Sequence, residues 1–571
     1  MAHLAPVRIT SGAIAGVPSA YNKSITVYRG IPYAASTAGE NRWRPPQPVL
    51  AWEGVRVADK FGPICPQVPM AAGEHAPAYS EDCLSVNVWT PVSPTEKTEK
   101  IPGKSLPVFV WIYGGRFTSG AGSDPQFEGT GLAAQGVVVV TLNYRLGILG
   151  WLASTELSAA SGHNASGNYG LLDQLAALKW VRDNIAAFGG DPEAVTIGGQ
   201  SAGGASVGLH LLSPLSRGLF RGVINQSGFR DPRDPLLGGL APAYRLKERA
   251  EHEGDSVLAE KGVATIDELR KLPLDVLLEG NNRNDTDRWG TPPFYRPCLD
   301  GYLFPLSFAG ALEQGAPADI PVMTGHNADE GGTYLDPEFT VEDLRACAEQ
   351  KYGPKLAERF FALYLESNSN SNSNSNSSDI PASALSIWNE AARDNSRITT
   401  ALWAEAFHKH ASSPVYGYIF THAPPSPGPK PVIGGRNTGA TATTATPMPM
   451  SKAPRNVYTY LKNGPSGMSR GAFHGAEVPF VFDNLDVQEG YTWAAADRDV
   501  AASVSTYWAN FIKTGNPSGG DAPTQTILPP FQPIDDSSIM SLGQDCAMVP
   551  LAKTPERVAF WRDYMAQHAP F

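Results

Sequence analysis

The serine at position 201 lies in a pattern that can support nucleophilic chemistry. Residues 199–203 read Gly-Gln-Ser-Ala-Gly and fit G-x-S-x-G, with an apolar strand-like segment before them and small residues after them. Such a turn needs small residues two places either side of the serine, because a Cβ there would clash with neighbouring chain. We therefore predict that Ser201 is raised above a sheet at a helix N-terminus, where developing negative charge is stabilised. The alternative is an ordinary glycine-rich turn.

A serine hydroxyl needs a base and an orienting acid, which follow the serine along the chain in this arrangement. Residues 471–477 read Gly-Ala-Phe-His-Gly-Ala-Glu, a glycine-flanked loop that suits the delivery of the His474 imidazole. Asp329 and Glu330 follow an apolar segment that we interpret as a strand, and the residues alone leave the choice of acid between them open. The other histidines that follow a plausible acid are predicted to lie on a solvated helix, in a Pro-rich loop or at the chain end: His408, His410, His422 and His568.

Short runs rich in valine and isoleucine, bounded by glycines, indicate the strands that must position these groups. They are Val108–Tyr113, Val137–Leu142, Val195–Ile197, Val223–Asn225 and Pro321–Thr324. The clearest helical pattern runs from Tyr169 to Phe188 and stops at Gly-Gly-Asp-Pro, residues 189–192. Strands that alternate with helices predict an α/β fold with a mostly parallel sheet.

The composition of the 571 residues restricts the possible partners. Lys and Arg number 45 and Asp and Glu 56, a net charge of −11, which gives no long-range attraction to nucleic acid or anionic membranes. No run of 18 apolar residues predicts a membrane span, and the first residues lack a signal-peptide pattern. We expect a cytoplasmic location, with a secreted, processed form as the alternative. The five cysteines have no metal-ligand spacing.

Two segments of biased composition interrupt the α/β pattern. Residues 367–378 are almost entirely Ser and Asn and predict a disordered surface linker. Residues 423–455 are rich in Pro, Thr, Ala and Gly and predict an irregular insertion. Because candidate functional residues lie on both sides of each segment, we predict a single domain over residues 1–571.

Motifs along the whole chain resemble the type-B carboxylesterase family, the branch of the α/β-hydrolases that includes the cholinesterases. They occur in the family's order at residues 28–34, 42–46, 81–88, 168–174, 188–192 and 508–517. The resemblance implies an α/β-hydrolase fold: a mixed, mostly parallel sheet, helices on both faces and large insertions. It implies Ser201 as nucleophile, Glu330 as acid and His474 as base. It also implies a small-molecule carboxylic ester as substrate, and no cofactor or metal.

The same resemblance assigns structural roles to other residues. It implies ion pairs of Arg42 with Glu81 and of Arg145 with Asp173. Cys65 and Cys83 match the family's first disulfide. The remaining cysteines are expected to be buried small hydrophobic residues rather than reactive thiols: Cys298, Cys347 and Cys546.

The donors of an oxyanion hole are expected on two segments. One is the backbone N–H of Ala202, and the others are those of Gly115 and Arg116 after the strand 108–113. The family normally has Gly or Ala where this chain has Arg116. Its guanidinium is predicted either to lie beside the reaction centre, favouring anionic esters, or to turn away and pair with an acid. Gln200 replaces the family's usual Glu, which removes a negative charge and weakens the case for a choline-type cationic substrate.

We therefore expect hydrolysis of carboxylic esters through an acyl-enzyme. Two alternatives remain on the sequence alone. One is an acyltransferase or lactone-forming enzyme with the same triad, and the other is a non-catalytic, cholinesterase-like binding protein.

Overall fold

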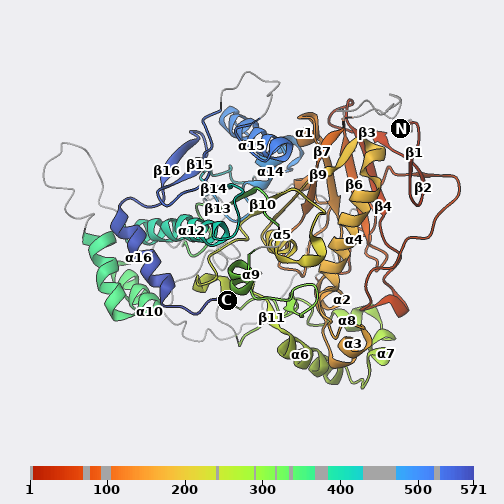
Figure 1. Ribbon diagram of the computed structural model, residues 1–571, viewed down its shortest axis with the longest axis horizontal. Helices are drawn as coiled ribbons and strands as arrows, with labels where there is room; N and C mark the ends of the chain where they lie inside the picture. Colours follow the sequence, from red (N-terminus) through yellow and green to blue (C-terminus); the bar gives the residue numbers. More distant parts are fainter. Residues whose placement is uncertain are drawn as a thin grey trace, which may run out of the picture.

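A large mixed sheet forms the centre of the protein, as the computed structural model shows (Figure 1). The structure describes residues 4–68, 77–91, 105–239, 243–287, 291–315, 318–333, 339–366, 383–427, 471–519 and 528–571. Within these ranges the sheet has 11 strands in the order β16-β15-β14-β13-β10-β9-β7-β8-β6-β4-β3. The predicted linker 367–378 and all of the predicted insertion except residues 423–427 lie outside the described residues.

The middle of the sheet is parallel and its two margins are antiparallel. The strands β8, β7, β9, β10, β13, β14 and β15 pair in parallel, and β16, β6, β4 and β3 join them antiparallel at the sides. This confirms the expected mostly parallel α/β sheet. The bounds are β3 Val17–Pro18, β4 Thr26–Pro32, β6 Ser85–Thr90, β7 Leu106–Ile112, β8 Val138–Leu142, β9 Gly190–Gln200, β10 Gly222–Gln226, β13 Val322–Asn327, β14 Val415–Phe420, β15 Ser538–Leu542 and β16 Ala547–Pro550.

Within the described residues, two small sheets lie outside the central one. The first contains β1 Val7–Ile9, β2 Gly12–Ala15 and β5 Val55–Val57, and the second contains β11 Arg245–Leu246 and β12 Cys298–Leu299. The α-helices are α1 Thr130–Ala134, α2 Gly147–Trp151, α3 Thr155–Ala160, α4 Tyr169–Asn184, α5 Ala202–Leu212, α6 Lys247–Glu260, α7 Ile266–Arg270, α8 Leu274–Leu278, α9 Phe308–Glu313, α10 Val341–Phe360, α12 Ala384–His408, α14 Val478–Val481, α15 Ala495–Thr514 and α16 Pro555–Ala566.

All five predicted strands are present, and the predicted helix differs at its end. The α-helix α4 stops at Asn184 and a 3₁₀ turn continues to Phe188. Gly189 then takes a left-handed conformation with φ 81°, which glycine adopts without strain. The strand β9 begins immediately afterwards at Gly190, so it is much longer than the predicted segment 195–197.

Helices cover both faces of the sheet, as two neighbouring side chains of β10 demonstrate. Asn225 donates from Nδ2 to the carbonyl of Gly204 on α5, at 2.6 Å. Gln226 accepts from the indole N–H of Trp508 on α15, at 3.2 Å. Successive side chains of a strand point to opposite faces, so α5 and α15 lie on opposite sides of the sheet. The core between them is apolar, and every residue of β8 is buried.

The structural ion pairs expected from the family are present. Arg42 makes two hydrogen bonds to the Glu81 carboxylate, at 2.6 and 2.7 Å. Arg145 and Asp173 are buried and bonded at 2.7 and 2.8 Å. Bidentate geometry of this kind fixes the position of both side chains.

The expected disulfide between Cys65 and Cys83 is not formed in the structure, which has both residues as buried free thiols. A hydrogen bond with Cys65 and burial raise the pKa of the Cys83 thiol. A raised thiol pKa disfavours the thiolate through which disulfides form. Cys298 and Cys347 are buried as expected, and Cys546 is partly exposed.

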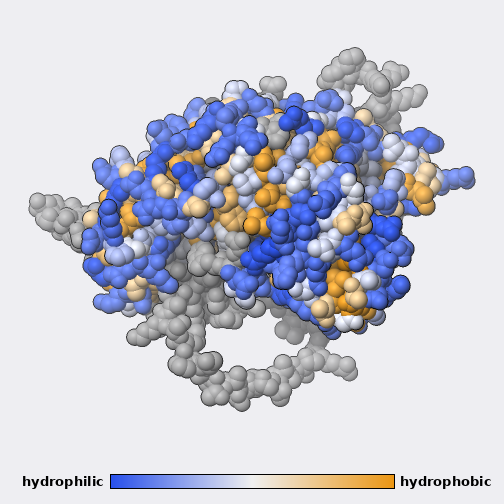
Figure 2. Space-filling model, turned by 60° about the horizontal axis from the view of Figure 1, so that its bottom comes forward, coloured by the Kyte–Doolittle hydropathy of each residue, from blue (hydrophilic) through white to orange (hydrophobic). Residues whose placement is uncertain are grey.

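One face of the surface is shown in Figure 2. On the face shown in Figure 2 most residues are hydrophilic and the hydrophobic ones form separate small patches. Among the described residues, no helix combines the length and hydrophobicity needed to cross a membrane.

Candidate active site

Ser201 lies at the sharp turn between β9 and α5. It is the N-cap residue of α5 and has φ 59° and ψ −121°, a strained conformation for a residue with a side chain. A Cβ on Gly199 would lie 2.6 Å from the backbone of Gly203, and one on Gly203 would lie 2.0 Å from the Ile112 carbonyl oxygen. The glycines on either side of Ser201 are therefore required by close backbone packing, as the sequence pattern predicted.

The parallel strands bring the ends of β9, β10 and β13 to one edge of the sheet. Gln200 pairs in register with Gln226, and Gln226 with Gly325. The ladder continues one residue further, because Ser201 N–H donates to Gln226 O at 2.9 Å and Ser227 N–H donates to Gly325 O at 2.8 Å. Ser201, Ser227 and the turn after β13 are thus neighbours at the carboxyl edge, where ligands bind in open α/β sheets.

Glu330 and His474 are joined by a hydrogen bond between Nδ1 of the imidazole and Oε2 of the carboxylate. The other carboxylate oxygen accepts from Ser227 Oγ and from the Asn327 N–H, each at 2.7 Å. Burial would raise the pKa of Glu330, but the charge and hydrogen bond of His474, with the Ser227 bond, outweigh it and lower the pKa to about 2. Glu330 is therefore an ionised acceptor.

The pKa of His474 is shifted in the opposite direction to that of Glu330. Burial lowers it, and the charge and hydrogen bond of Glu330 raise it by more, so the pKa of His474 lies above its ordinary value. An imidazole whose cation is stabilised in this way can take up a proton during a reaction.

Asp329, the other candidate acid, holds the loop that carries His474 rather than the imidazole itself. Its carboxylate accepts from Ala472 N–H at 2.7 Å and is paired with Arg393. Its own N–H donates to the Ala472 carbonyl at 3.0 Å. The geometry therefore favours Glu330 as the residue that orients His474, in agreement with the family resemblance.

The other candidate histidines make different contacts. His422 is bonded through Nε2 to Asp497 at 2.6 Å, and His408 and His568 contact backbone carbonyls close to them in sequence. His408, the last residue of α12, and His410, just after it, are exposed as predicted, although most of α12 is buried. None of these three contacts involves Glu330.

The sequence analysis missed Ser227 and Glu477. Ser227 has φ 55° directly after β10, where it repeats the strand–serine geometry of Ser201. Glu477 is fully buried and accepts from Gln226 at 3.0 Å and from Asn327 at 2.5 Å. Burial and the nearby charge of Glu330 raise the pKa of Glu477. The only available signal for Ser227 was its place two residues after the predicted strand Val223–Asn225, and this signal is weak.

The loop after β7 lies directly against the turn at Ser201. A Cβ on Gly114 would be 2.5 Å from the Gln200 carbonyl oxygen and 3.0 Å from the Ser201 Cβ. Gly115 has φ 108° and its carbonyl accepts from Ser119 N–H at 3.0 Å. The three expected oxyanion donors, on Gly115, Arg116 and Ala202, thus belong to two segments in contact with each other.

The Arg116 side chain is exposed and bonded to a neighbouring loop. Its Nη2 donates to Asn284 Oδ1 at 2.9 Å and to the Thr291 carbonyl at 3.1 Å. Both of these acceptors are neutral, so these contacts are not the ion pair with an acid that was one of the two predictions. The residue itself has φ 58°, in the left-handed region.

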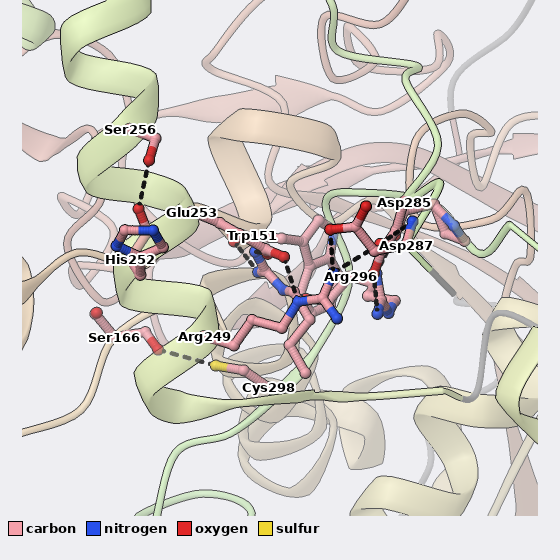
Figure 3. A network of polar contacts seen from close by, with 12 residues as sticks. Trp151, Ser166, Arg249, His252, Glu253, Ser256, Asp285, Asp287, Arg296 and Cys298 are labelled. Atoms are coloured by element: carbon pink, nitrogen blue, oxygen red, sulfur yellow. Dashed lines mark hydrogen bonds and ion pairs between the residues drawn. The ribbon is translucent and has the colours of Figure 1, made fainter. Parts of the chain in front are cut away.

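Figure 3 shows an ion-pair network around Asp285, the residue after the Arg116 acceptor Asn284. Asp285, next to Asn284, accepts from Arg249 at 2.7 Å and from Arg296 at 2.8 Å. Arg249, on α6, also donates to Glu253 at 2.6 Å. Burial would raise the pKa of Asp285, but the two arginines outweigh it and lower it. The network therefore links the loop that Arg116 contacts to helix α6.

A cavity of about 470 Å³ adjoins the His474 loop. Phe473, Gly475 and Ala476 form part of its wall, and Tyr491 and Trp493 stack at 4.9 Å on another part. The acidic side chains Asp124 and Glu489 also line it. Its volume lies within the range that suits small organic ligands. Among the described residues no group of three or more His, Cys, Asp or Glu is placed to hold a metal.

A mixed, mostly parallel sheet with a strained serine between a strand and a helix, and a His–Glu pair at the same edge, defines an α/β-hydrolase. The carboxylesterase family model matches residues 4–561, and the chain belongs to this family. Two relatives are each 35% identical. One is the fumonisin B1 esterase of Sphingopyxis macrogoltabida, over 91% of this chain and 84% of the relative. The other is the para-nitrobenzyl esterase of Bacillus subtilis, over 86% of both chains.

Solved structures agree with this assignment. A structure of a PNB esterase, 29% identical in sequence, covers 99% of this chain and 100% of its own with a TM-score of 0.70. The protein is accordingly a carboxylic ester hydrolase.

Proposed function

We propose that the protein hydrolyses carboxylic esters through an acyl-enzyme formed on Ser201. The observation that carries this proposal is the His474–Glu330 pair, whose acid is held by two further hydrogen bonds at the sheet edge where Ser201 begins α5. In the first step Ser201 Oγ attacks the ester carbonyl carbon and its proton passes to His474 Nε2. Glu330 stabilises the imidazolium through Nδ1–H.

The oxyanion of the tetrahedral intermediate accepts hydrogen bonds from the N–H groups of Gly115, Arg116 and Ala202. Collapse of the intermediate breaks the ester C–O bond, and the leaving alcohol takes the proton from His474. Water then loses a proton to His474 and attacks the acyl-enzyme, which releases the carboxylic acid and restores Ser201.

The Ser201→Ala variant tests this mechanism. With para-nitrophenyl acetate, the wild type should give a burst of para-nitrophenol, and the variant should give none and lose roughly 10⁴–10⁶ in turnover. A fluorophosphonate probe should label the wild type on Ser201. A burst or labelling that persists in the folded variant would exclude Ser201 as the nucleophile. Adding an alcohol or amine acceptor, with product analysis, separates hydrolysis from acyl transfer.

We also propose that the preferred esters carry an anionic group near the scissile bond. The exposed Arg116 guanidinium extends from the residue expected to hold the oxyanion, and the network around Asp285 fixes the loop that it contacts. An arginine held in this way can bind a carboxylate through charge-assisted hydrogen bonds. The names of the relatives make para-nitrobenzyl esters and fumonisin B1 reasonable first substrates for comparison.

We propose a cytoplasmic location. This location predicts that Cys65 and Cys83 are reduced in the cell, since thiols stay reduced in that compartment. Intact-mass measurement after alkylation of protein from its native cells would test this: both cysteines should be alkylated without a reductant. Protection of the pair until a reductant is added would indicate an oxidising compartment instead.

A further inference from the structure

The side chain of Gln200 contacts the catalytic imidazole. Its Nε2 lies 3.2 Å from Nε2 of His474. Gln200 is the last residue of β9 and only 9% exposed, and Gly475 lies beside its amide. The contact therefore joins Gln200, directly before the proposed nucleophile, to His474, which must accept the proton of Ser201.

The bonding partners define which atom donates. Oε2 of the ionised Glu330 can only accept, so Nδ1 of His474 must carry the hydrogen. In the neutral imidazole Nε2 then has a lone pair and no hydrogen. The Gln200 amide is the donor in this bond, and it occupies the lone pair that Ser201 Oγ–H needs during catalysis.

We propose that Gln200 is a positioning residue that holds the neutral His474 ring ready in the resting enzyme and exchanges its bond for that of Ser201 when substrate binds. This inference rests on the proposed acyl-enzyme mechanism. Gln200 acts through His474 and does not itself react. Glu330 already holds Nδ1 and leaves Nε2 as an acceptor, and the Gln200 amide then fixes the orientation of the ring at Nε2.

Charged and titratable groups from several elements surround His474. Glu330, after β13, and Glu477, at the start of α14, favour the imidazolium. Arg230, after β10, and the buried His326, on β13, oppose it. A donated hydrogen bond from Gln200 favours the neutral ring, whereas the carboxylate that the family usually has at position 200 would add a third anion and favour the imidazolium.

The test is the pH dependence of kcat/KM for para-nitrophenyl acetate in Gln200→Met, which keeps the shape and removes the donor. We expect the acidic limb to move to higher pH by about half a unit to one unit, the equivalent of one ordinary hydrogen bond. Gln200→Glu should move it further in the same direction. The ¹⁵N chemical shift of His474 Nε2 at high pH should also change in Gln200→Met, because the nitrogen loses its donor.

Gln174→Met is the matched control. Gln174, on α4, is buried and its Oε1 lies 3.0 Å from Nε2 of His210, a second Gln–His contact. This variant should reproduce the wild-type pH profile and His474 resonance, even if it melts at a lower temperature.

A Gln200→Met profile and His474 resonance identical to those of the wild type and the control would overturn the proposal. The same is true of a shift of the acidic limb to lower pH. If Gln200→Met does not fold, Gln200→Asn, whose shorter amide cannot reach the ring, replaces it with the same expectations. The burst measured in the same samples keeps the two hypotheses separate: a burst without a pH shift rejects the role of Gln200 alone, and absence of a burst in the wild type rejects the acyl-enzyme mechanism.

Discussion

Ser227 donates a hydrogen bond of 2.7 Å from Oγ to Oε1 of Glu330. Since the other oxygen of this carboxylate binds His474, the hydroxyl fixes the plane of the acid on the side away from the imidazole. Ser227 follows β10 as Ser201 follows β9, so the two adjacent strands supply the nucleophile and a support for the acid.

Replacing Ser227 by alanine should lower kcat roughly ten- to a hundredfold, because a hydrogen bond to a charged group contributes about 1.5–3 kcal/mol. The expected KM is nearly unchanged, since the bond supports the acid rather than the substrate. Ser206→Ala provides a control. Ser206, on α5, is a buried hydroxyl that accepts a hydrogen bond from Gln174 on α4. If both variants lose the same activity, the effect of Ser227 is one of general packing.

Glu330→Gln should lose about 10⁴ in turnover, by analogy with removal of the acid from other triads. Asp329→Asn should lose far less, since an asparagine Oδ1 can still accept from Ala472 N–H and hold the His474 loop. Steady-state kinetics on both folded variants decides the assignment. A larger loss of turnover in Asp329→Asn would make Asp329 the orienting acid.

The pH profile follows from the direction of the His474 shift. The imidazole must be neutral to accept the Ser201 proton, so kcat/KM should fall as the pH drops through the pKa of His474. Because Glu330 raises that pKa, the midpoint should lie above the ordinary value of about 6.5. Residual activity of Glu330→Gln should show a midpoint at lower pH, and an unchanged midpoint would mean that another group titrates.

Gly203→Ala tests the close packing below the nucleophile. The added Cβ would lie 2.0 Å from the Ile112 carbonyl oxygen, so backbone must shift at the turn that carries Ser201. We expect a loss of about 1–3 kcal/mol of stability and most of the activity. Gly238→Ala is the control, because nothing lies within 4 Å of its Cβ position. Thermal unfolding should show a lower Tm for the first variant alone, and equal Tm values would contradict the packing argument.

The parts of the site that follow from local chemistry were predictable from sequence. The turn at Ser201 needs its glycines because of steric clashes within a few residues, and those clashes leave a pattern in the chain. The choice of Glu330 over Asp329 came from the family resemblance. The two acids are adjacent in sequence, and they differ in which part of the His474 loop each one contacts. That loop is more than 140 positions away in the sequence, and no local pattern indicates its contact with either carboxylate.

Contacts between distant segments account for what the sequence analysis missed. Gln200 was interpreted only as a lost charge, although its amide meets His474 across 274 positions. The contact of Cys65 with Cys83, which raises the pKa of the Cys83 thiol, likewise joins two separate segments. For Arg116, no pattern in the sequence indicates its contacts with Asn284 and Thr291, because they belong to a loop that is distant along the chain and is bonded through Asp285 to Arg249.

The guanidinium of Arg116 should control the ratio of kcat/KM for an anionic ester to that for a neutral ester of the same size, such as the para-nitrophenyl hemisuccinate and butyrate. Arg116→Gly and Arg116→Gln both retain the backbone N–H, so the neutral ester should still be hydrolysed. The ratio should fall roughly ten- to a hundredfold in both variants, the equivalent of one charge-assisted pair. Asp285→Asn weakens the ion pairs that fix the Asn284 loop and should lower the ratio by less. A ratio that stays at the wild-type value in Arg116→Gly and Arg116→Gln would mean that the side chain only anchors the loop and that the anion preference is wrong.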